Sequence, residues 1–308
     1  MIIKRDYYLN QLIGSRHNGL IKIITGLRRS GKSYLLFNLF TSYLKEQGVD
    51  DDHIIKVDLE DRRNISLRNP DALLAHIDSL MKDSNMYYIL LDEVLHVPEF
   101  EDVLNSYLKI ENADVYVTGS NSRFLSSDII TEFRGRGDQI HVYPLSFAEF
   151  MSVNDRHPLE AWPDYYTYGG LPHVITLETP KKKEDYLKRL FATVYVKDIV
   201  ERYNIRGEVE LKELVHVIAS AIGSPTNPNK LANTFKSLKN VSLTNKTIDN
   251  YLGYMSDSFL IEKAIRYDIK GKKYINTLAK YYFTDVGVRN SILDLRQQEE
   301  NHIMENTI

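Results

Sequence analysis

Residues that could bind a phosphate group lie close together near the start of the chain. The four fixed positions of the pattern G-x-x-x-x-G-K-[ST] are filled by Gly26, Gly31, Lys32 and Ser33. Glycines let a backbone wrap a phosphate, so that successive N–H groups and the start of a helix point at its oxygens. In such a loop the lysine reaches the β- and γ-phosphates, and the hydroxyl beside it ligates Mg²⁺. The pattern therefore predicts a site for ATP and Mg²⁺, with a chance glycine-rich turn as the alternative.

The rest of this loop is predicted to contact the same nucleotide. We expect ATP to bind along the whole loop and the first residues of the following helix, namely Gly26, Leu27, Arg28, Arg29, Ser30, Gly31, Lys32, Ser33 and Tyr34. The side chains of Arg28 and Arg29 either help to hold phosphate or point to solvent, and the sequence leaves both outcomes open.

Two acidic residues, Asp92 and Glu93, directly follow the apolar segment 86–91. Acids at the C-terminal end of a buried strand form the Walker B arrangement, in which Asp92 would hold Mg²⁺ through a water molecule and Glu93 would polarise the attacking water. A surface acidic pair that ends a strand is the alternative. A further predicted strand, 53–59, separates the two motifs along the chain, whereas the two motif strands of nucleotide kinases are typically adjacent. This extra strand and the glutamate favour the ATP-hydrolysing branch of P-loop proteins.

Further polar residues follow the next strands. The segment 114–118 leads into Ser120, which would lie beside the acidic pair and contact the γ-phosphate or the water, unless it only caps the strand end. Arg134 and Arg136 could stabilise transition-state charge in the same chain or in a neighbouring subunit, or serve as surface cations. The predicted catalytic set is therefore Lys32, Asp92, Glu93, Ser120, Arg134 and Arg136, and the predicted metal ligands are Ser33 and Asp92.

The elements that must position these residues alternate between strands and helices. Short apolar segments predict strands at 20–25, 53–59, 86–91, 114–118 and 139–143. Helical spacing predicts helices at 32–46, 71–81 and 103–110. Strands that alternate with helices indicate an α/β fold with a mainly parallel sheet. The fold class we predict is a three-layer P-loop NTPase core.

The second half of the chain has a different pattern. One long amphipathic helix is predicted at 184–203, then helices at 211–222, 229–239 and 246–256, then strands at 260–267 and 273–275 around a turn at Gly271. Three helices followed by a β-hairpin are typical of a winged helix-turn-helix. This segment is mildly basic, because residues 212–289 hold 12 Lys and Arg against 6 Asp and Glu. It permits DNA as a partner without requiring one.

If the winged helix binds DNA, polar residues on its second helix and wing would contact phosphates and base edges. These candidates are Thr244, Asn245, Lys246, Asn250, Lys270, Lys272 and Lys273. The same helix carries Asp249 and only one cation, so a protein-contact or intramolecular regulatory role is the alternative.

Composition excludes several classes of protein. The 308 residues are 43% hydrophobic and 26% charged, as in soluble globular proteins, and they include no cysteine. A disulfide scaffold, a thiolate nucleophile and cysteine-ligated metal sites are therefore excluded. The first residues hold no apolar run long enough for a signal peptide, and no window approaches 18 uncharged apolar residues. We expect a cytoplasmic protein with no membrane segment.

Several stretches together resemble one family. They are RDYYLNQL, GLRRSGKSYLL, LLDEV, VTGSNSRFLS, FRGRGDQIHVYPLSFAEF, YGGLP, TVYVKDIVERY and TNKTIDNYLGYMSDSFLI through KYYFTDVGVRN. The chain resembles the prokaryotic AAA-type ATPases related to the archaeal-ATPase and STAND groups of AAA+ proteins. The resemblance implies an AAA+ core over 1–150, a helical lid over 151–205 and a winged helix over 206–290. Residues 291–308 would begin a further, nuclease-like domain that is truncated or lost here.

The resemblance also implies where the adenine lies. Gly170-Leu171-Pro172 matches a G-x-P element that contacts the base, and Arg5-Asp6 matches an arginine–acid pair near it. On residues alone, the GGLP segment could be only a helix breaker. Relatives often have a glutamine and a tryptophan after the acidic pair, where this chain has Leu95 and Phe100, so a coupling role for that glutamine is not transferred.

Three functions remain open on the sequence. The leading one is Mg²⁺-dependent ATP hydrolysis that repositions the lid and the winged helix. The second is a switch in which ATP, with little turnover, controls a winged helix that binds DNA or a protein. The third, a small-molecule or nucleotide kinase, would need an acceptor pocket. ATP and ADP are the expected ligands, and the oligomeric state is left open between a ring and a monomer.

Overall fold

The computed structural model describes residues 2–120, 136–239, 243–265, 278–295 and 305–307. The chain divides into two compact units, Met1–Tyr143 and Pro144–Ile308. The division of the second unit into a lid, a winged helix and a further domain remains a prediction.

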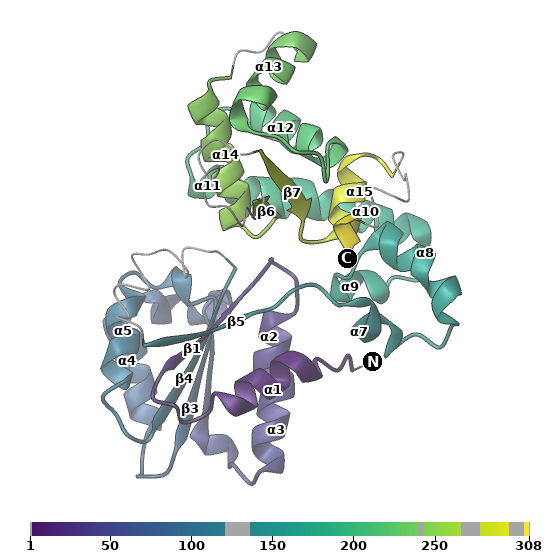
Figure 1. Cartoon of the computed structure of the whole chain (residues 1–308). Coiled ribbons are helices and arrows are strands. Elements are labelled where there is room, and N and C mark those ends of the chain that lie inside the picture. Colours follow the sequence, from purple (N-terminus) through teal and green to yellow (C-terminus); the bar gives the residue numbers. More distant parts are fainter. Residues whose placement is uncertain (1, 121–135, 240–242, 266–277, 296–304, 308) are drawn as a thin grey trace, which may run out of the picture. The chain divides into compact units, whose positions relative to one another are not determined.

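The first unit is built on a five-stranded parallel sheet (Figure 1). Its strands are β1 (Ile21–Thr25), β2 (Ile54–Asp58), β3 (Tyr87–Asp92), β4 (Ala113–Gly119) and β5 (Gly137–His141). Helices are expected on both faces of a parallel sheet, which explains why the strands read as continuous apolar runs. β1 and β3, for example, are buried at every position. The predicted α/β fold with a parallel sheet is confirmed.

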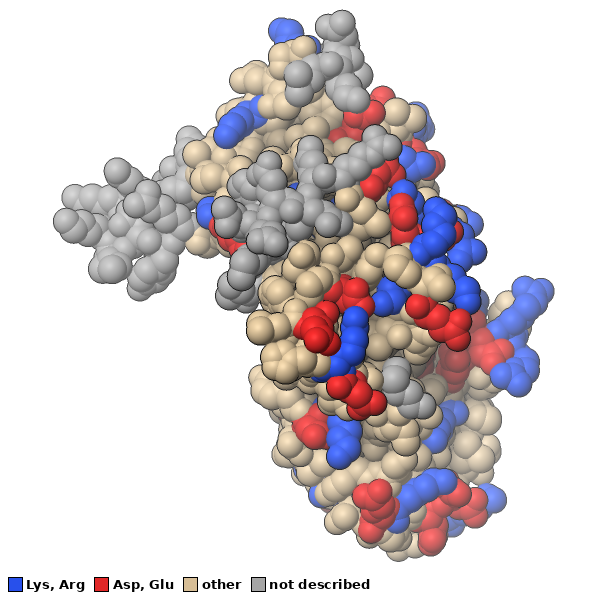
Figure 2. Space-filling view, turned by 90° about the vertical axis from the view of Figure 1, so that its right-hand side faces the viewer, with Lys and Arg blue, Asp and Glu red and all other residues tan. Residues whose placement is uncertain are grey.

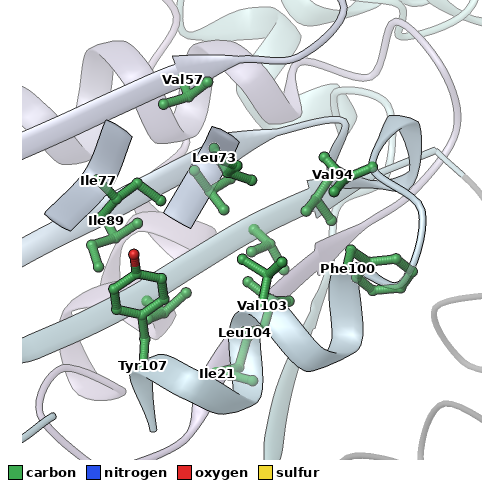
Figure 3. Packing of buried hydrophobic residues seen from close by; sticks show 14 of the residues in the cluster. Ile21, Val57, Leu73, Ile77, Ile89, Val94, Phe100, Val103, Leu104 and Tyr107 are labelled. Carbon is green, nitrogen blue, oxygen red and sulfur yellow. The ribbon is translucent and has the colours of Figure 1, made fainter. Parts of the chain in front are cut away.

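Two apolar clusters hold the helices against the two faces of this sheet. On one face, α4 (Pro70–Leu80) and α5 (Phe100–Tyr107) pack on the strands through Leu73, Ile77, Val103 and Leu104 (Figure 3). The other face is covered by α1 (Asp6–Gly14) and by the continuous helical run α2 (Lys32–Tyr34), η1 (Leu35–Phe40) and α3 (Thr41–Glu46). The short 3₁₀ segments are η2 (Asp51–His53), η3 (Arg62–Arg68) and η4 (Val94–His96). The three layers predicted from the sequence are therefore present.

The order of the strands in the sheet is β2-β3-β4-β1-β5. The strand that separates β1 from β3 in space is thus β4, which comes later in the chain. β2, which separates the two motifs along the chain, lies at the edge of the sheet. Since all neighbouring pairs are parallel, β1, β3 and β4 end at the same edge, where the loop, the acidic pair and Ser120 follow them.

β5 begins two residues earlier than predicted. Its register with β1 runs from Ile21↔Gly137 to Thr25↔His141, so the strand ends at His141 rather than at Tyr143. The apolar signal of this strand is confined to its end, because Ile140 and Val142 are buried while Gly137 and Gln139 are exposed. Apolar pattern alone therefore placed the strand too late.

The second unit is mainly helical. Its elements are α7 (Phe147–Met151), α8 (Pro158–Tyr168), α9 (Pro172–Ile175), α10 (Pro180–Leu190), η6 (Phe191–Val196), α11 (Lys197–Arg202), α12 (Glu208–Ser220), α13 (Pro228–Lys239), α14 (Asn245–Asp257), β6 (Ile261–Ile265), β7 (Ala279–Phe283) and α15 (Val286–Ile292). The long helix predicted at 184–203 corresponds to the continuous run α10–η6–α11.

The strand that pairs with β6 is β7, in antiparallel register from Ile261↔Phe283 to Ile265↔Ala279. No strand is predicted at 279–283 from the sequence, although burial alternates along this segment, with Ala279, Tyr281 and Phe283 inside. The strand predicted at 273–275 and the wing residues Gly271, Lys270, Lys272 and Lys273 lie outside the described residues.

Candidate functional site

The loop between β1 and α2 can be built only around glycine at its start. Gly26 has φ +139°, and a Cβ there would lie 2.1 Å from the carbonyl oxygen of Val142. Gly31, which precedes α2, has φ 99° and ψ 18°. Any side chain at Gly26 would collide with the backbone that follows β5, so the first glycine of the pattern is needed for close approach.

Lys32 is buried at the start of α2, with 4% of its surface exposed. Its Nζ donates to the carbonyl oxygens of Gly26 at 3.0 Å and Leu27 at 3.2 Å, so the ammonium lies within the loop. Burial lowers the pKa of Lys32, and the nearby carboxylates of Glu93 and Asp92 oppose that shift. The loop therefore encloses the ammonium group of Lys32, which could bind an anion as well as the two backbone carbonyl oxygens.

Ser33 and Asp92 come from different elements and meet directly. The Ser33 hydroxyl donates to Oδ2 of Asp92 at 2.8 Å, and Thr118 of β4 donates to Oδ1 of Asp92 at 2.6 Å. Burial raises the pKa of Asp92, while the two hydroxyls favour its charged form. The Ser33 hydroxyl and the Asp92 carboxylate predicted to hold Mg²⁺ thus lie within hydrogen-bond distance of each other, close enough to act on one cation, with Asp92 doing so through a water molecule.

Glu93 is held by the strand beside it. Its N–H donates to the hydroxyl of Thr118 at 2.9 Å, and its Oε2 accepts from the hydroxyl of Ser120 at 3.2 Å and from the N–H of Ser120 at 3.3 Å. Glu93 has φ 50°, an uncommon conformation for a residue with a side chain. Ser120 therefore lies beside the acidic pair, as its position at the end of β4 predicted.

Arg5 lies under the loop. Its guanidinium donates to the carbonyl oxygen of Ser30 at 2.9 Å and to that of Tyr143 at 2.7 Å, and it stacks on the ring of Tyr8 at 4.6 Å. Because C=O and N–H point in opposite directions across a trans peptide, this contact turns the N–H of Gly31 away from Arg5. Arg5 is 3% exposed, so the residue expected near the base supports the loop backbone here.

The remaining charged and aromatic residues of the loop and of α2 are at least partly exposed. Arg28 forms an ion pair with Glu60, which follows β2, and Tyr34 is 38% exposed. Arg29 has φ 72°. Arg136 is exposed at the start of β5, and Arg134 lies outside the described residues.

Pro172, the residue expected to contact adenine, begins α9 in the second unit. The turn before it is closed by the buried carboxylate of Asp285, which accepts from the N–H of Gly170 at 2.8 Å and from that of Val288 at 2.9 Å. The nearby N–H groups of Leu171 and Gly287 also favour the charged form of this carboxyl and so oppose the rise in its pKa. The backbone of the GGLP segment is thus engaged by Asp285, a residue the sequence analysis did not single out.

Two features of the loop fit a nucleotide and its metal. The hydroxyl Oγ of Ser30 is fully buried and has no hydrogen-bond partner among the described residues, in the middle of a loop with buried Lys32. The hydroxyl of Ser33 and the carboxylate of Asp92 supply oxygen ligands, the type that Mg²⁺ prefers.

Of the described helices, none is long and apolar enough to cross a membrane.

Thr118, Glu60 and Asp285 were missed by sequence reasoning, each for a physical reason. A threonine inside a strand reads as an ordinary β-former. Glu60 is one of several acids in an exposed stretch after β2. Asp285 lies 115 residues from its partner Gly170, so no local pattern connects them. Only the run T-G-S at the end of β4 could have drawn attention to Thr118 as well as to Ser120.

Comparison with known proteins places the chain in a family. Residues 18–151 match the model of an AAA domain, and residues 159–299 match a domain of unknown function. An uncharacterized protein of Haemophilus influenzae is 33% identical over 100% of this chain and 78% of its own length. An uncharacterized protein of Methanocaldococcus jannaschii is 29% identical over 100% of this chain and 68% of its own length.

A solved structure has the same fold. The Walker-type ATPase of Pyrococcus abyssi superposes with a TM-score of 0.65 and 16% sequence identity, over 95% of this chain and 96% of its own. The motif geometry, the strand order and these matches agree with one another. The chain therefore belongs to one family with the H. influenzae protein, and that family is one of the prokaryotic AAA-type P-loop ATPases.

Proposed function

We propose that the first unit binds ATP with Mg²⁺ in the loop 26–33 and hydrolyses it. One observation carries this proposal: an unbroken series of hydrogen bonds joins Ser33 to Asp92, Asp92 to Thr118, Thr118 to Glu93 and Glu93 to Ser120. This series links the residue expected to bind the metal to the residue expected to activate water. An acidic pair that merely ended a strand at the surface would not need it.

The residues would divide the work as follows. Lys32 and the N–H groups of the loop would hold the β- and γ-phosphates, and Ser33 and Asp92 would hold Mg²⁺. When bound, Mg²⁺ neutralises charge on the phosphate oxygens. Glu93 would accept a proton from a water molecule whose oxygen forms the new bond to the γ-phosphorus. The bond from that phosphorus to the bridging oxygen of ADP breaks, and ADP and inorganic phosphate leave.

Two substitutions test binding and chemistry separately. Lys32→Ala should weaken ATP binding by at least about tenfold, because it removes the buried cation that holds phosphate. Glu93→Gln should keep ATP binding and lower turnover by about 10²-fold or more, because an amide cannot accept the proton. Phosphate release and binding of a fluorescent ATP analogue measure the two effects.

Matched controls lie outside the site in the same unit. Lys45→Ala removes a cation from the exposed surface of α3, and Glu99→Gln makes the same change as Glu93→Gln at an exposed position beside α5. Both should behave as the unaltered chain. Equal ATP affinity in the unaltered chain and in Lys32→Ala would refute the proposed site.

We further propose that the ATP state repositions the second unit. Its order of α12, α13, α14, β6 and β7 follows that of a winged helix-turn-helix, and an isolated bridge between Thr226 and Ala279 adds a third extended segment to the hairpin. Gain or loss of a γ-phosphate changes which loop contacts are favourable, as in other nucleotide switches. Limited proteolysis of 151–290 with ATP, ADP and no nucleotide would test this.

The second candidate is a switch with little turnover, whose winged helix binds DNA or a protein. Lys230, Lys236 and Lys246 on α13 and α14 favour a polyanion, whereas Asp249 on α14 opposes one. On the face drawn in Figure 2, acidic and basic side chains are interspersed rather than gathered by sign. Size measurement with and without duplex DNA, in each nucleotide state, separates a ring, a monomeric switch and a DNA-bound regulator. Affinity for DNA through phosphates would fall steeply with salt.

A further inference from the structure

One hydroxyl in the first unit contacts both acids of the site. Thr118, on β4, is fully buried, and its Oγ1 donates to Oδ1 of Asp92 at 2.6 Å while accepting from the N–H of Glu93 at 2.9 Å. β4 is the direct neighbour of β3, with Leu91 opposite Val117. Beyond the pairing of the two strands, one side-chain oxygen on β4 therefore contacts both the last residue of β3 and the residue that follows it.

These two bonds fix the direction of the Asp92 carboxylate. A hydroxyl has one hydrogen to donate, and that of Thr118 is committed to Oδ1. The other oxygen, Oδ2, then lies toward α2, where it accepts from Ser33 at 2.8 Å. Without the Thr118 hydroxyl, a buried carboxylate would lose one of its two side-chain donors and could rotate about its Cβ–Cγ bond.

The same hydroxyl supports the backbone of Glu93. Glu93 has φ 50° and ψ 50°, a left-handed conformation that L-residues adopt rarely and that persists when its surroundings hold it. Its N–H is satisfied by Thr118, and its carboxylate reaches Ser120 from that conformation. A relaxed backbone at Glu93 would move the carboxylate away from Ser120.

We propose that Thr118 is a positioning residue that sets the orientation of both Asp92 and Glu93 for ATP hydrolysis. It touches neither the nucleotide nor the reacting water; it acts through the two acids. This inference rests on the proposed function and adds to it, because it assigns the alignment of the metal-binding and water-activating groups to one buried hydroxyl.

Three substitutions at this position separate the hydroxyl from the bulk of the side chain. Thr118→Val keeps the shape and removes the hydroxyl, Thr118→Ala removes the hydroxyl and a methyl group, and Thr118→Ser keeps the hydroxyl. Thr41→Val is the matched control, because Thr41 is also buried in the first unit and, within the described part of the chain, its hydroxyl hydrogen-bonds only the backbone carbonyl of Leu36, at 3.4 Å.

We expect Thr118→Val and Thr118→Ala to lower kcat for ATP about 10²-fold, the size of loss that small misplacements of catalytic groups cause. The KM for ATP should change less than about threefold, because Lys32 and the loop are untouched. The Mg²⁺ concentration for half-maximal activity should rise. Thr118→Ser should restore kcat to within about threefold of the unaltered chain, and Thr41→Val should leave kcat unchanged.

The outcomes distinguish this inference from the proposed function. If the unaltered chain hydrolyses ATP and both Thr118→Val and Thr118→Ala keep its kcat, the inference alone is overturned. If Thr118→Ser has as low a kcat as Thr118→Val, the hydroxyl is not what matters and the inference is overturned. It is also overturned if the loss of kcat only follows a lower melting temperature that Thr41→Val shares, because packing would then explain the loss. If the unaltered chain releases no phosphate from ATP, the proposed function falls and this inference with it.

Discussion

Two buried carboxylates, one in each unit, have different kinds of partners. Asp92 accepts hydrogen bonds from the side-chain hydroxyls of Ser33 and Thr118, whereas Asp285 accepts from backbone N–H groups at Gly170 and Val288. Burial raises the pKa of both carboxyls. The two carboxylates are equally buried, so the difference lies in their donors. We infer that Asp92 can exchange a hydroxyl donor for a metal ion, whereas Asp285 keeps its backbone donors and stabilises the fold.

The exposed Ser33 hydroxyl can turn toward a metal ion, whereas backbone N–H donors cannot turn away from their acceptor. Ser33 and Asp92 can exchange their mutual hydrogen bond for bonds to a metal ion without unfolding either element. The N–H groups around Asp285 are fixed by α9, by α15 and by the turn between α8 and α9, so a carboxylate that left them would leave buried donors without partners. The donors of Asp92 therefore suit the metal-binding role proposed for it, whereas Asp285 joins the GGLP turn to the start of α15.

The largest effect that tests this comparison is on stability. Asp285→Ala should lower the free energy of unfolding of the second unit by about 3–5 kcal/mol, because it leaves the buried N–H groups of Gly170 and Val288 without their partner. Asp92→Ala should change the stability of the first unit by about 1 kcal/mol or less, yet abolish Mg²⁺-dependent turnover. Urea unfolding and hydrogen exchange of Gly170 and Val288 measure the first effect.

The opposite pattern would break the comparison. A well-folded Asp285→Ala chain with protected amides at Gly170 and Val288 would mean that the carboxylate is not what closes the GGLP turn. A first unit that unfolds in Asp92→Ala would mean that Asp92 is structural as well as functional.

The site around Asp92 could be predicted from the sequence, because its motifs are contiguous along the chain. The loop 26–33 and the acidic pair are contiguous motifs, so their residue types and spacing identify them, and their strands follow from apolar runs. The sheet order, with β4 between β1 and β3, depends on long-range pairing and could not be read from chain order. The GGLP segment was identified, but its partner Asp285 lies far along the chain, and a carboxylate before an apolar helix reads only as a helix cap.

A second prediction concerns pH. Burial raises the pKa of Asp285 from 3.8 to about 6, so the folded state binds this proton more tightly than the unfolded state does. Its contribution to stability is therefore greatest below about pH 4, falls as pH rises toward 6, and is constant above that. The difference is about 3 kcal/mol between the two plateaus.

Urea unfolding at several pH values between 4 and 7 checks this, with Asp285→Asn as the control that cannot titrate. The slope of stability against pH in the second unit should be smaller in Asp285→Asn. Because burial also raises the pKa of Asp92, that carboxyl contributes a slope of the same sign in the first unit, and Asp92→Asn removes its contribution separately. Identical slopes in the unaltered chain and in Asp285→Asn would show that folding does not raise the pKa of Asp285.

A small stability effect is also expected at Ser33, the exposed donor to Asp92. Ser33→Ala removes the hydroxyl of an exposed residue, whose net contribution to folding is about 1 kcal/mol, because Asp92 keeps the hydrogen bond from Thr118. The same change should raise the Mg²⁺ concentration needed for half-maximal ATPase activity by about tenfold or more, since it removes one of the two residues proposed to hold the metal ion. Magnesium titration of phosphate release, beside a thermal melt without metal, compares the two effects. A large loss of stability with an unchanged Mg²⁺ dependence would mean that Ser33 has a structural role, as Asp285 does. The proposed difference between an exchangeable hydroxyl donor and fixed backbone N–H donors would then be wrong.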